Sequence, residues 1–281
     1  MHFFDSHTHL ESPQFDPDRA QVIARAISAD VEHMVTCGSD LATSSSEIAL
    51  AGQWRGVYAA VGIHPHESRL AAHETCEGSG SWKLDENVLG RLSDLAAQPK
   101  VVAIGEIGLD YHYDFSPREA QIGVLARQLA LACDLELPVI LHNRESDQDL
   151  RHLVDEAPDS LRGVLHCFLA DQAMADWALA RGLCIGIAGP ITFRNVRHLA
   201  KIVRGIPLDR LLIETDAPHL APHPRRGGRN EPAFVVHVAE KVADVLGVSL
   251  QEVARRTTEN ACRLFGVGSS PAPPAPEVEL P

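Results

Sequence analysis

The sequence predicts an α/β protein, a (β/α)8 barrel of the TIM type with an extra C-terminal helix. Short apolar runs alternate with longer segments of helical periodicity, which is typical of a parallel sheet. Eight such strand–helix units fill about 265 residues, the usual size of this barrel. A doubly wound open sheet is the structural alternative, but no glycine-rich dinucleotide fingerprint follows the first strand.

The strands are expected where β-branched and aromatic residues gather in short runs. These runs lie at 2–9, 33–38, 57–64, 101–110, 137–144, 162–168, 183–189 and 211–218. Parallel neighbours need crossover connections, and each gap contains a helical pattern. The helical patterns lie at 17–30, 40–53, 85–97, 118–135, 146–157, 171–181 and 195–204, with two more at 232–246 and 249–265.

One domain is expected over residues 1–267. The Gly/Ser-rich stretch 73–84 interrupts the third strand–helix unit and predicts a surface loop. Residues 268–281 are rich in proline and cannot build a core, so a disordered tail is expected there.

Charge and cysteine usage narrow the function classes. The chain has 38 acidic against 25 basic residues, a formal charge of −13, which disfavours a protein that coats DNA or an anionic membrane. Its six cysteines form no CxxC pair, which indicates a reducing compartment. We find neither a signal peptide nor a membrane span in the sequence, and therefore expect a soluble, cytoplasmic protein.

Ionisable residues interrupt the apolar strands near their C-terminal ends. An ionisable group in such a strand is costly unless it is paired or binds a metal. The C-terminal mouth of a (β/α)8 barrel is where active sites form, so these groups should converge there. Imidazoles and carboxylates together suit one or two divalent ions, with a carboxylate able to bridge them. The residues are His7, His9, Glu106, His142, His166 and Asp216.

Around these residues the sequence resembles the TatD-like metal-dependent hydrolases, a family of DNases and related enzymes in the amidohydrolase superfamily. The resemblance runs from residue 1 to about residue 266. It rests on DSHTHL (5–10), GIHPH (62–66), AIGEIGLDYHYD (103–114), PVILHNRES (138–146), GVLHCF (163–168), GPITF (189–193), ETDAPHLAP (214–222), RNEP (229–232) and NACRLF (260–265).

The resemblance implies a binuclear site on the barrel. In such a site His7, His9 and Asp216 hold one ion, while His142 and His166 hold the other. Glu106 bridges the two. The cofactors are then two divalent metal ions per subunit, and Mg, Mn or Zn would each suit this donor set.

The mechanism we expect is hydrolysis by a metal-bound hydroxide that attacks phosphorus in line. Asp216 is the best candidate to accept the proton of the water, and Glu106 shares the catalytic centre with it. His64, at the end of the third strand, could contact a phosphate oxygen or support the ligands. Asp5 is expected to orient a ligand imidazole.

A basic loop after the eighth strand points to a phosphodiester substrate. From His219 to His237 three arginines (Arg225, Arg226 and Arg229) face one glutamate, a local charge of +2. Loops at this end of a barrel often bind phosphate, so we expect these arginines to contact DNA or another phosphodiester. Gly228 stands where the family usually has a lysine. So small a basic patch favours an exonuclease acting on single-stranded ends.

Three further questions stay open at this point. Tyr111, Tyr113 and Phe115 are the aromatics nearest the mouth, and either base stacking or packing would explain them. An amidohydrolase or deacylase that attacks a carbonyl could use the same metals. A non-enzymatic scaffold stabilised by metal is the third reading. Substitution of the three loop arginines would distinguish the two enzyme hypotheses. It should abolish phosphodiester cleavage by a nuclease but spare amide cleavage by an amidohydrolase.

Overall fold

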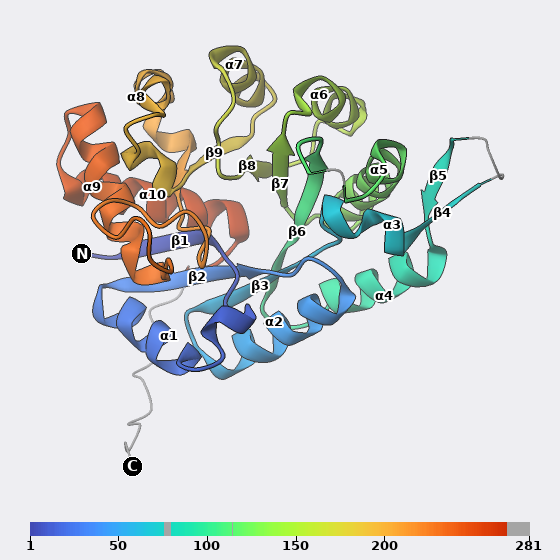
Figure 1. The fold of residues 1–281 in the computed structure, drawn as a ribbon, viewed down its shortest axis with the longest axis horizontal. Coiled ribbons are helices and arrows are strands. Elements are labelled where there is room, and N and C mark those ends of the chain that lie inside the picture. The colour runs from blue at the N-terminus through green and yellow to red at the C-terminus, as the bar shows by residue number, and fades with distance from the viewer. Residues whose placement is uncertain (76–79, 114, 269–281) are drawn as a thin grey trace.

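The computed structural model describes residues 1–75, 80–113 and 115–268. Eight parallel strands form one sheet in the order in which they occur along the chain, which confirms the predicted barrel (Figure 1). The strands are β1 (Phe3–Thr8), β2 (Val31–Cys37), β3 (Val57–Val61), β6 (Val101–Asp110), β7 (Val139–Arg144), β8 (Gly163–Leu165), β9 (Cys184–Ile187) and β10 (Leu211–Ile213).

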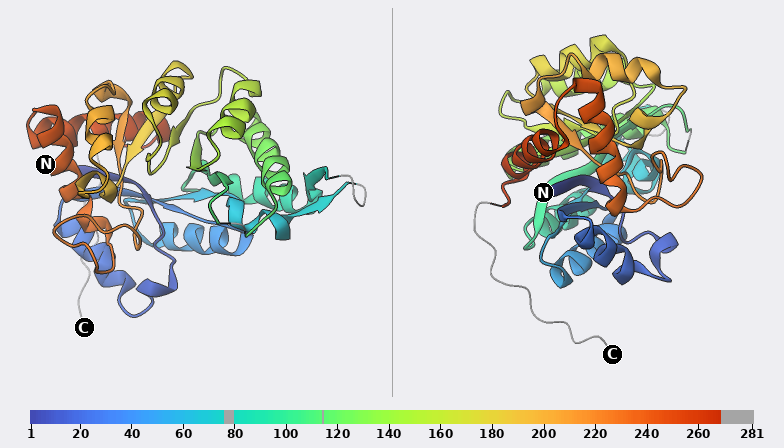
Figure 2. Two further views of the ribbon diagram at one scale, coloured as in Figure 1. Left: turned by 45° about the horizontal axis from the view of Figure 1, so that its top comes forward. Right: turned by 90° about the vertical axis from the view of Figure 1, so that its left-hand side faces the viewer.

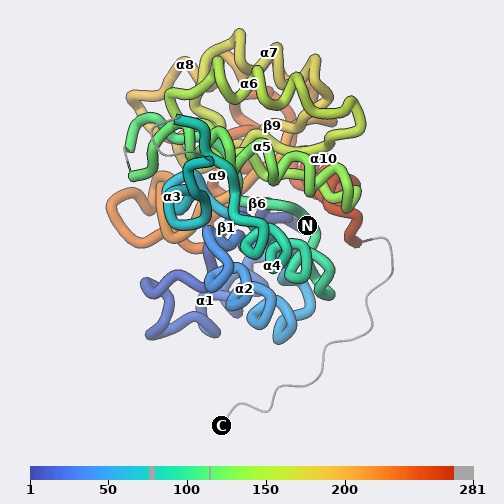
Figure 3. The backbone as a smooth tube through the Cα atoms, turned by 90° about the vertical axis from the view of Figure 1, so that its right-hand side faces the viewer, coloured from blue at the N-terminus to red at the C-terminus, as the bar shows by residue number. Residues whose placement is uncertain are grey.

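Helices surround the sheet, with α1, α2 and α4 on one side of the barrel and α6, α7 and α8 on the opposite side (Figure 3). Side-chain and glycine caps set their limits: Asp40 accepts a hydrogen bond from Thr43 at the start of α2, and Gly247 and Gly266 end α9 and α10 in the left-handed region. The helices are α1 (Arg19–Ser28), α2 (Leu41–Gln53), α3 (Ser68–Ala71), α4 (Glu86–Ala96), α5 (Arg118–Asp134), α6 (Asp147–Glu156), α7 (Gln172–Ala180), α8 (Arg197–Val203), α9 (Val235–Leu246) and α10 (Leu250–Phe265).

The barrel closes where its first strand meets the segment after its last strand. Thr8 forms a parallel bridge with Ala217. His9 N–H donates to Ala217 O at 2.8 Å, and Asp216 N–H donates to His7 O at 2.9 Å. This seam places two of the predicted imidazoles beside the predicted carboxylate.

The core has two main parts and a third, small cluster of Ile63, Ala71, Leu84 and Val124. A large cluster fills the space between the strands and the helices, and a smaller one fills the barrel interior. α10 lies beside β1 at the N-terminal end of the barrel (Figure 2), where Ala261, Leu264 and Phe265 pack against Phe4 and the other interior side chains. The helix therefore seals one end of the barrel and leaves the other for the site. The interior strand residues are Phe4, Val35, Cys37, Ala60, Val102, Ala103, Ile140, Val164, Cys184 and Leu212.

The prediction of a surface loop over 73–84 is wrong at both ends of this range, where the structure has strands. Two short strands, β4 (Ala72–Glu74) and β5 (Trp82–Leu84), pair in antiparallel fashion and project beyond α5 (Figure 1). The hairpin lies directly on α5, because a Cβ at Gly123 would stand 2.2 Å from Trp82 O. This tertiary contact stabilises strands too short for sequence periodicity to reveal.

The tail predicted for 268–281 lies outside the described residues, apart from Gly268. Within the described parts of the chain, no helix is both long and apolar enough to cross a membrane.

Candidate metal centre

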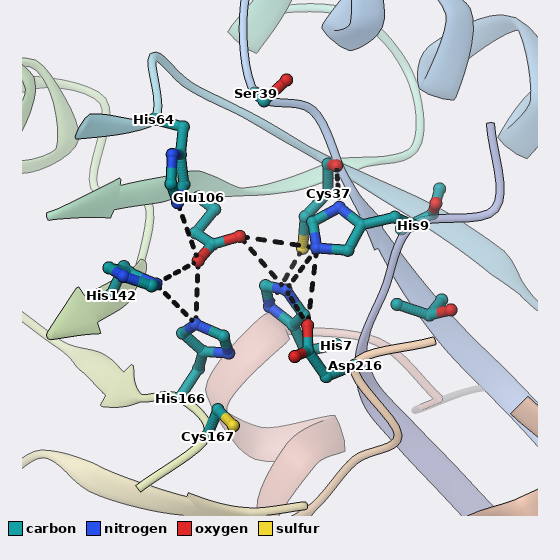
Figure 4. Close-up of polar contacts among 12 residues, drawn as sticks. His7, His9, Cys37, Ser39, His64, Glu106, His142, His166, Cys167 and Asp216 are labelled. Atoms are coloured by element: carbon teal, nitrogen blue, oxygen red, sulfur yellow. Dashed lines mark hydrogen bonds and ion pairs between the residues drawn. The ribbon is translucent and has the colours of Figure 1, made fainter. Parts of the chain in front are cut away.

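Glu106 stands at the centre of a cluster of histidines (Figure 4). Its Oε1 lies 2.8 Å from both His142 Nδ1 and His166 Nε2, and 3.5 Å from His64 Nε2. Its Oε2 faces the other way, 3.3 Å from His7 Nε2 and 3.5 Å from His9 Nε2. One buried carboxylate thus separates two groups of imidazoles.

The first group joins β1 to the segment after β10. Asp216 Oδ1 lies 3.6 Å from His7 Nε2 and 3.5 Å from His9 Nε2, and the two Nε2 atoms are 3.1 Å apart. His9 Nδ1 lies 2.9 Å from Cys37 O, so Nδ1 carries a hydrogen and donates to that carbonyl. In the neutral ring, the lone pair of Nε2 then faces Asp216 and Glu106.

The second group contains one more histidine than the sequence analysis assigned to it. His142 Nδ1 and His166 Nε2 are 3.3 Å apart and share Glu106 Oε1. His64, predicted as a substrate contact or support, reaches the same oxygen from the segment after β3. His64 is therefore a third imidazole candidate beside His142 and His166.

Local backbone features bring these side chains together. A Cβ at Gly108 would lie 2.0 Å from His142 O, so only glycine lets β6 approach β7 this closely. Asp216 adopts a left-handed φ of 57°, a conformation that aspartate tolerates better than most residues. Its hydrogen bond to His7 O and a further one from His219 N–H to Asp216 O hold it there.

The charges within the cluster stabilise one another. Burial alone would raise the pKa of Glu106, but the surrounding imidazoles, His166 foremost, hold it well below its usual range. Burial lowers the pKa of His64 to about 4. It opposes protonation of His9 as well, yet Asp216 and Glu106 raise the pKa of His9 to about 9. Both carboxylates are therefore anionic at neutral pH.

The donor set fits divalent cations. Each member offers a nitrogen or oxygen lone pair, and imidazole with carboxylate is the mixture that such cations accept. There are three sets of residues in which all donor atoms of the set lie within 4.8 Å of one another, and Glu106 belongs to two of these sets. The sets are His7, His9 and Asp216; His7, Glu106 and His166; and His64, Glu106 and His142.

Three polar residues that the sequence analysis did not single out also belong to this region. Asp110 ends β6, and its Oδ2 lies 3.2 Å from His142 Nε2 and 3.0 Å from His66 Nε2. Glu214 is fully buried and accepts hydrogen bonds from Cys167 N–H and Ser6 Oγ. The third, Arg144, ends β7. Their only signal in the sequence was an acidic or basic residue next to a strand end.

Asp5 does not orient an imidazole as expected. Its Oδ2 accepts from Thr215 Oγ1 at 2.5 Å, and its Oδ1 accepts from the backbone N–H of Thr215 at 2.8 Å and of His7 at 3.4 Å. It acts on the backbone instead, holding β1 to the segment that carries Asp216.

A cleft of about 1270 Å³ opens at the C-terminal ends of the strands and contains the cluster. Among its described lining residues, Arg144 is the single lysine or arginine. Seven carboxylates line it: Glu11, Glu67, Glu106, Asp110, Glu145, Asp147 and Asp216. Without bound cations this cleft would repel a phosphate.

The basic loop lies apart from the cluster, and none of its three arginines lines the cleft as described. Arg229 donates to both carboxylate oxygens of Asp18, at 2.7 and 2.8 Å. Arg225 lies 5.3 Å over the Phe234 ring, and Arg226 lies 3.7 Å over the ring of Phe193, which does line the cleft. Phosphate contact by these arginines stays a prediction.

Comparison with known proteins finds a matching family model and several similar proteins. A family model described as TatD related DNase matches residues 4–266. The uncharacterized metal-dependent hydrolase YabD of Bacillus subtilis (strain 168) is 40% identical over 265 residues, covering 94% of this chain and 99% of the relative. The 3'-5' ssDNA/RNA exonuclease TatD of Cronobacter sakazakii is 39% identical over 275 residues, covering 96% and 100%. The crystal structure of YjjV, a TatD homolog from Escherichia coli K12, superposes with a TM-score of 0.84 at 30% identity, covering 95% of this chain and 98% of the other.

Proposed function

Because the chain belongs to the TatD-related DNase family of metal-dependent hydrolases, we propose that it cleaves phosphodiester bonds of DNA at single-stranded ends. The observation that carries the proposal is the position of Glu106, whose two oxygens face different groups of imidazoles. Such a carboxylate is suited to bridge two divalent ions. The ions we expect are Mg, Mn or Zn.

His7, His9 and Asp216 would hold one ion, and His142 and His166 the other, with Glu106 between them. When bound, the ions would polarise the phosphate and make water acidic enough to attack near neutral pH. They would also offset the seven carboxylates of the cleft, which otherwise disfavour an anionic substrate.

The protein's own groups would orient the reaction and move its protons. Asp216 is anionic, since burial would raise its pKa but His9 and His7 lower it to about 2. It lies 13% exposed at the floor of the cleft, where it can accept the proton of an attacking water. A hydrogen bond from His9 Nδ1 to Cys37 O fixes that imidazole beside Asp216, and one from His7 N–H to Asp5 holds the backbone of β1 in place.

Several observations favour a strand end as substrate. The packed barrel interior gives the cleft a floor, so a strand enters it but cannot thread through. Arg225, Arg226 and Arg229 remain proposed phosphate contacts, and Arg226 lies over the ring of the cleft-lining Phe193. The Cronobacter sakazakii relative is named an exonuclease of ssDNA and RNA.

The proposal is tested by incubating the purified protein with 5'-labelled single-stranded DNA, with and without chelator. Glu106→Gln should lose bound metal and at least about 100-fold in rate, since it removes a charge shared by two sites. Glu145→Gln is the matched control, because Glu145 also lines the cleft but, among the residues that the structure describes, pairs only with the exposed His112. Cleavage of acylated amines in place of DNA would instead support an amidohydrolase.

A further inference from the structure

Tyr113 and Phe115 are exposed aromatic side chains at the rim of the cleft. Their rings are parallel, with centroids 5.6 Å apart and an interplanar angle of 6°. Tyr113 is 42% exposed and Phe115 is 62% exposed, and both line the cleft. Resting on the nuclease function proposed above, we propose that this pair, with Arg144, forms a platform on which a nucleobase of the substrate strand stacks.

The neighbouring Tyr111 shows what an aromatic with a packing role looks like here. It packs against the main core, its hydroxyl donates to Asp149 at 2.7 Å, and Arg118 covers its ring at 4.2 Å. The Tyr113 hydroxyl, by contrast, has no hydrogen-bond partner in the described parts of the chain. Core packing does not account for Tyr113 and Phe115, whereas stacking on a ligand would.

Arg144 adds the charge that a nucleotide requires. Its guanidinium lies 4.9 Å over the Tyr113 ring, and among the described residues it forms no ion pair. It is exposed and follows His142 by two positions in β7. An unpaired arginine next to stacked rings matches the two parts of a nucleotide, a flat base and an anionic phosphate.

Asp110 links this platform to the metal-ligand candidates. Its Oδ1 accepts hydrogen bonds from His112 N–H at 2.9 Å and from Tyr113 N–H at 3.0 Å, while its Oδ2 lies 3.2 Å from His142 Nε2. Gln121 donates to Asp110 O at 3.0 Å and to Ser116 O at 2.9 Å, so both ends of the platform are tied to α5. A base on the platform would therefore sit at a fixed distance from the reacting phosphate.

The ligand chemistry that this geometry selects is an unpaired base of any sequence. Each base presents a flat π face, and stacking on an aromatic side chain does not read its edges. A base within a duplex already stacks on its neighbours and is not free to occupy the platform. The platform would thus recognise the presence of a base rather than its identity.

The test measures binding of a fluorescent single strand to the full chain by anisotropy, with Mg present and with non-hydrolysable linkages in the strand so that no cleavage occurs. It compares an intact strand with strands that lack the base at each of the last three positions. We expect one abasic position to weaken wild-type binding on the order of ten-fold. Phe115→Ala and Phe115→Leu should abolish that difference, Phe115→Trp should keep it, and Arg144→Ser should weaken both strands equally.

Leu70→Ala is the control, because Leu70 is 84% exposed but does not line the cleft. The platform would be overturned if the wild type bound intact and abasic strands equally. It would also be overturned if an abasic position weakened binding to Phe115→Ala as much as binding to the wild type. Cleavage with metal is measured in parallel. Cleavage without base dependence would refute the platform alone, whereas base-dependent binding without any cleavage would refute the nuclease proposal and retain the platform.

Discussion

Arg229 and Asp18 form a two-pronged ion pair, with Nη1 2.7 Å from Oδ1 and Nη2 2.8 Å from Oδ2. The pair joins the loop after β10 to the start of α1. Arg229 also donates to Gln14 O at 2.7 Å and lies 4.8 Å over the Phe15 ring. The positive charge of Arg229 is therefore already paired with a carboxylate of the protein.

This pair predicts that Asp18→Ala and Arg229→Ala are not additive. Each change should lower the melting temperature by on the order of 1–3 °C, and the double change should lower it by less than the sum of the two, because both single changes remove the Arg229–Asp18 contact. Each change also removes a contact of its own, that of Asp18 with Arg25 or that of Arg229 with Gln14 O. Thermal unfolding of the three variants checks this. Arg225→Ala is the control. A higher KM for DNA in Arg229→Ala but not in Asp18→Ala would show that Arg229 also contacts phosphate, as proposed above.

Metal affinity should rise with pH. A metal binds the neutral imidazole, and the pKa of His9 is raised to about 9 in the metal-free chain, with those of His142 and His166 also raised. These rings hold protons at neutral pH that a metal must displace, so binding strengthens between about pH 6 and pH 9. Calorimetry in buffers of different ionisation enthalpy should detect proton release, and a pH-independent affinity would contradict this account.

Glu214 is expected to act as a positioning residue for His166. Its Oε1 lies 3.6 Å from His166 Nδ1, and it accepts from Cys167 N–H and Ser6 Oγ. A glutamine has one acceptor oxygen in place of two, so Glu214→Gln should cost about 1–3 kcal/mol of unfolding free energy and weaken metal binding about 10-fold or more. Chemical denaturation and metal titration measure the two effects.

A second variant tests the same role without changing charge. A Cβ at Gly186 would lie 2.5 Å from Glu214 Oε2, so Gly186→Ala should push the carboxylate away and also weaken metal binding. Gly90→Ala is the control, since no atom lies within 4 Å of a Cβ there. Normal metal affinity in both Glu214→Gln and Gly186→Ala would show that Glu214 does not position His166.

Glu47 should make the fold less stable as pH rises. It is fully buried in α2, its Oε2 has no hydrogen-bond partner among the described residues, and burial raises its pKa from 4.5 to about 7. The folded state therefore holds this proton more tightly than the unfolded state, and the free energy of unfolding falls between these two pH values.

Glu47→Gln removes this ionisation. The variant should gain up to about 3 kcal/mol over the wild type above pH 7 and little below pH 4.5, as the shift in the Glu47 pKa implies. Urea unfolding at both ends of the range checks it. Glu119→Gln, on the exposed side of α5, serves as the control and should show no such dependence. An equal stability change at both pH values would argue against a buried titration.

The sequence predicted the barrel and the six-residue cluster for a physical reason. Alternating apolar runs mark the strands locally, and an imidazole or carboxylate at a strand end stands out against them. The partners of buried polar groups leave no such mark, because they lie far apart in sequence. Arg229 binds Asp18, 211 residues away, and Ser6 binds Glu214, 208 residues away. The hairpin on α5 was missed likewise, since it depends on the space that Gly123 leaves.

The seam between Thr8 and Ala217 sets the order in which the protein becomes competent during synthesis. His7 and His9 leave the ribosome more than 200 residues before their partner Asp216. The cluster of candidate metal ligands cannot be complete before Asp216 has been made. A nascent chain is thus without its full complement of ligands until the barrel is ready to close, which delays hydrolytic activity until the chain has folded.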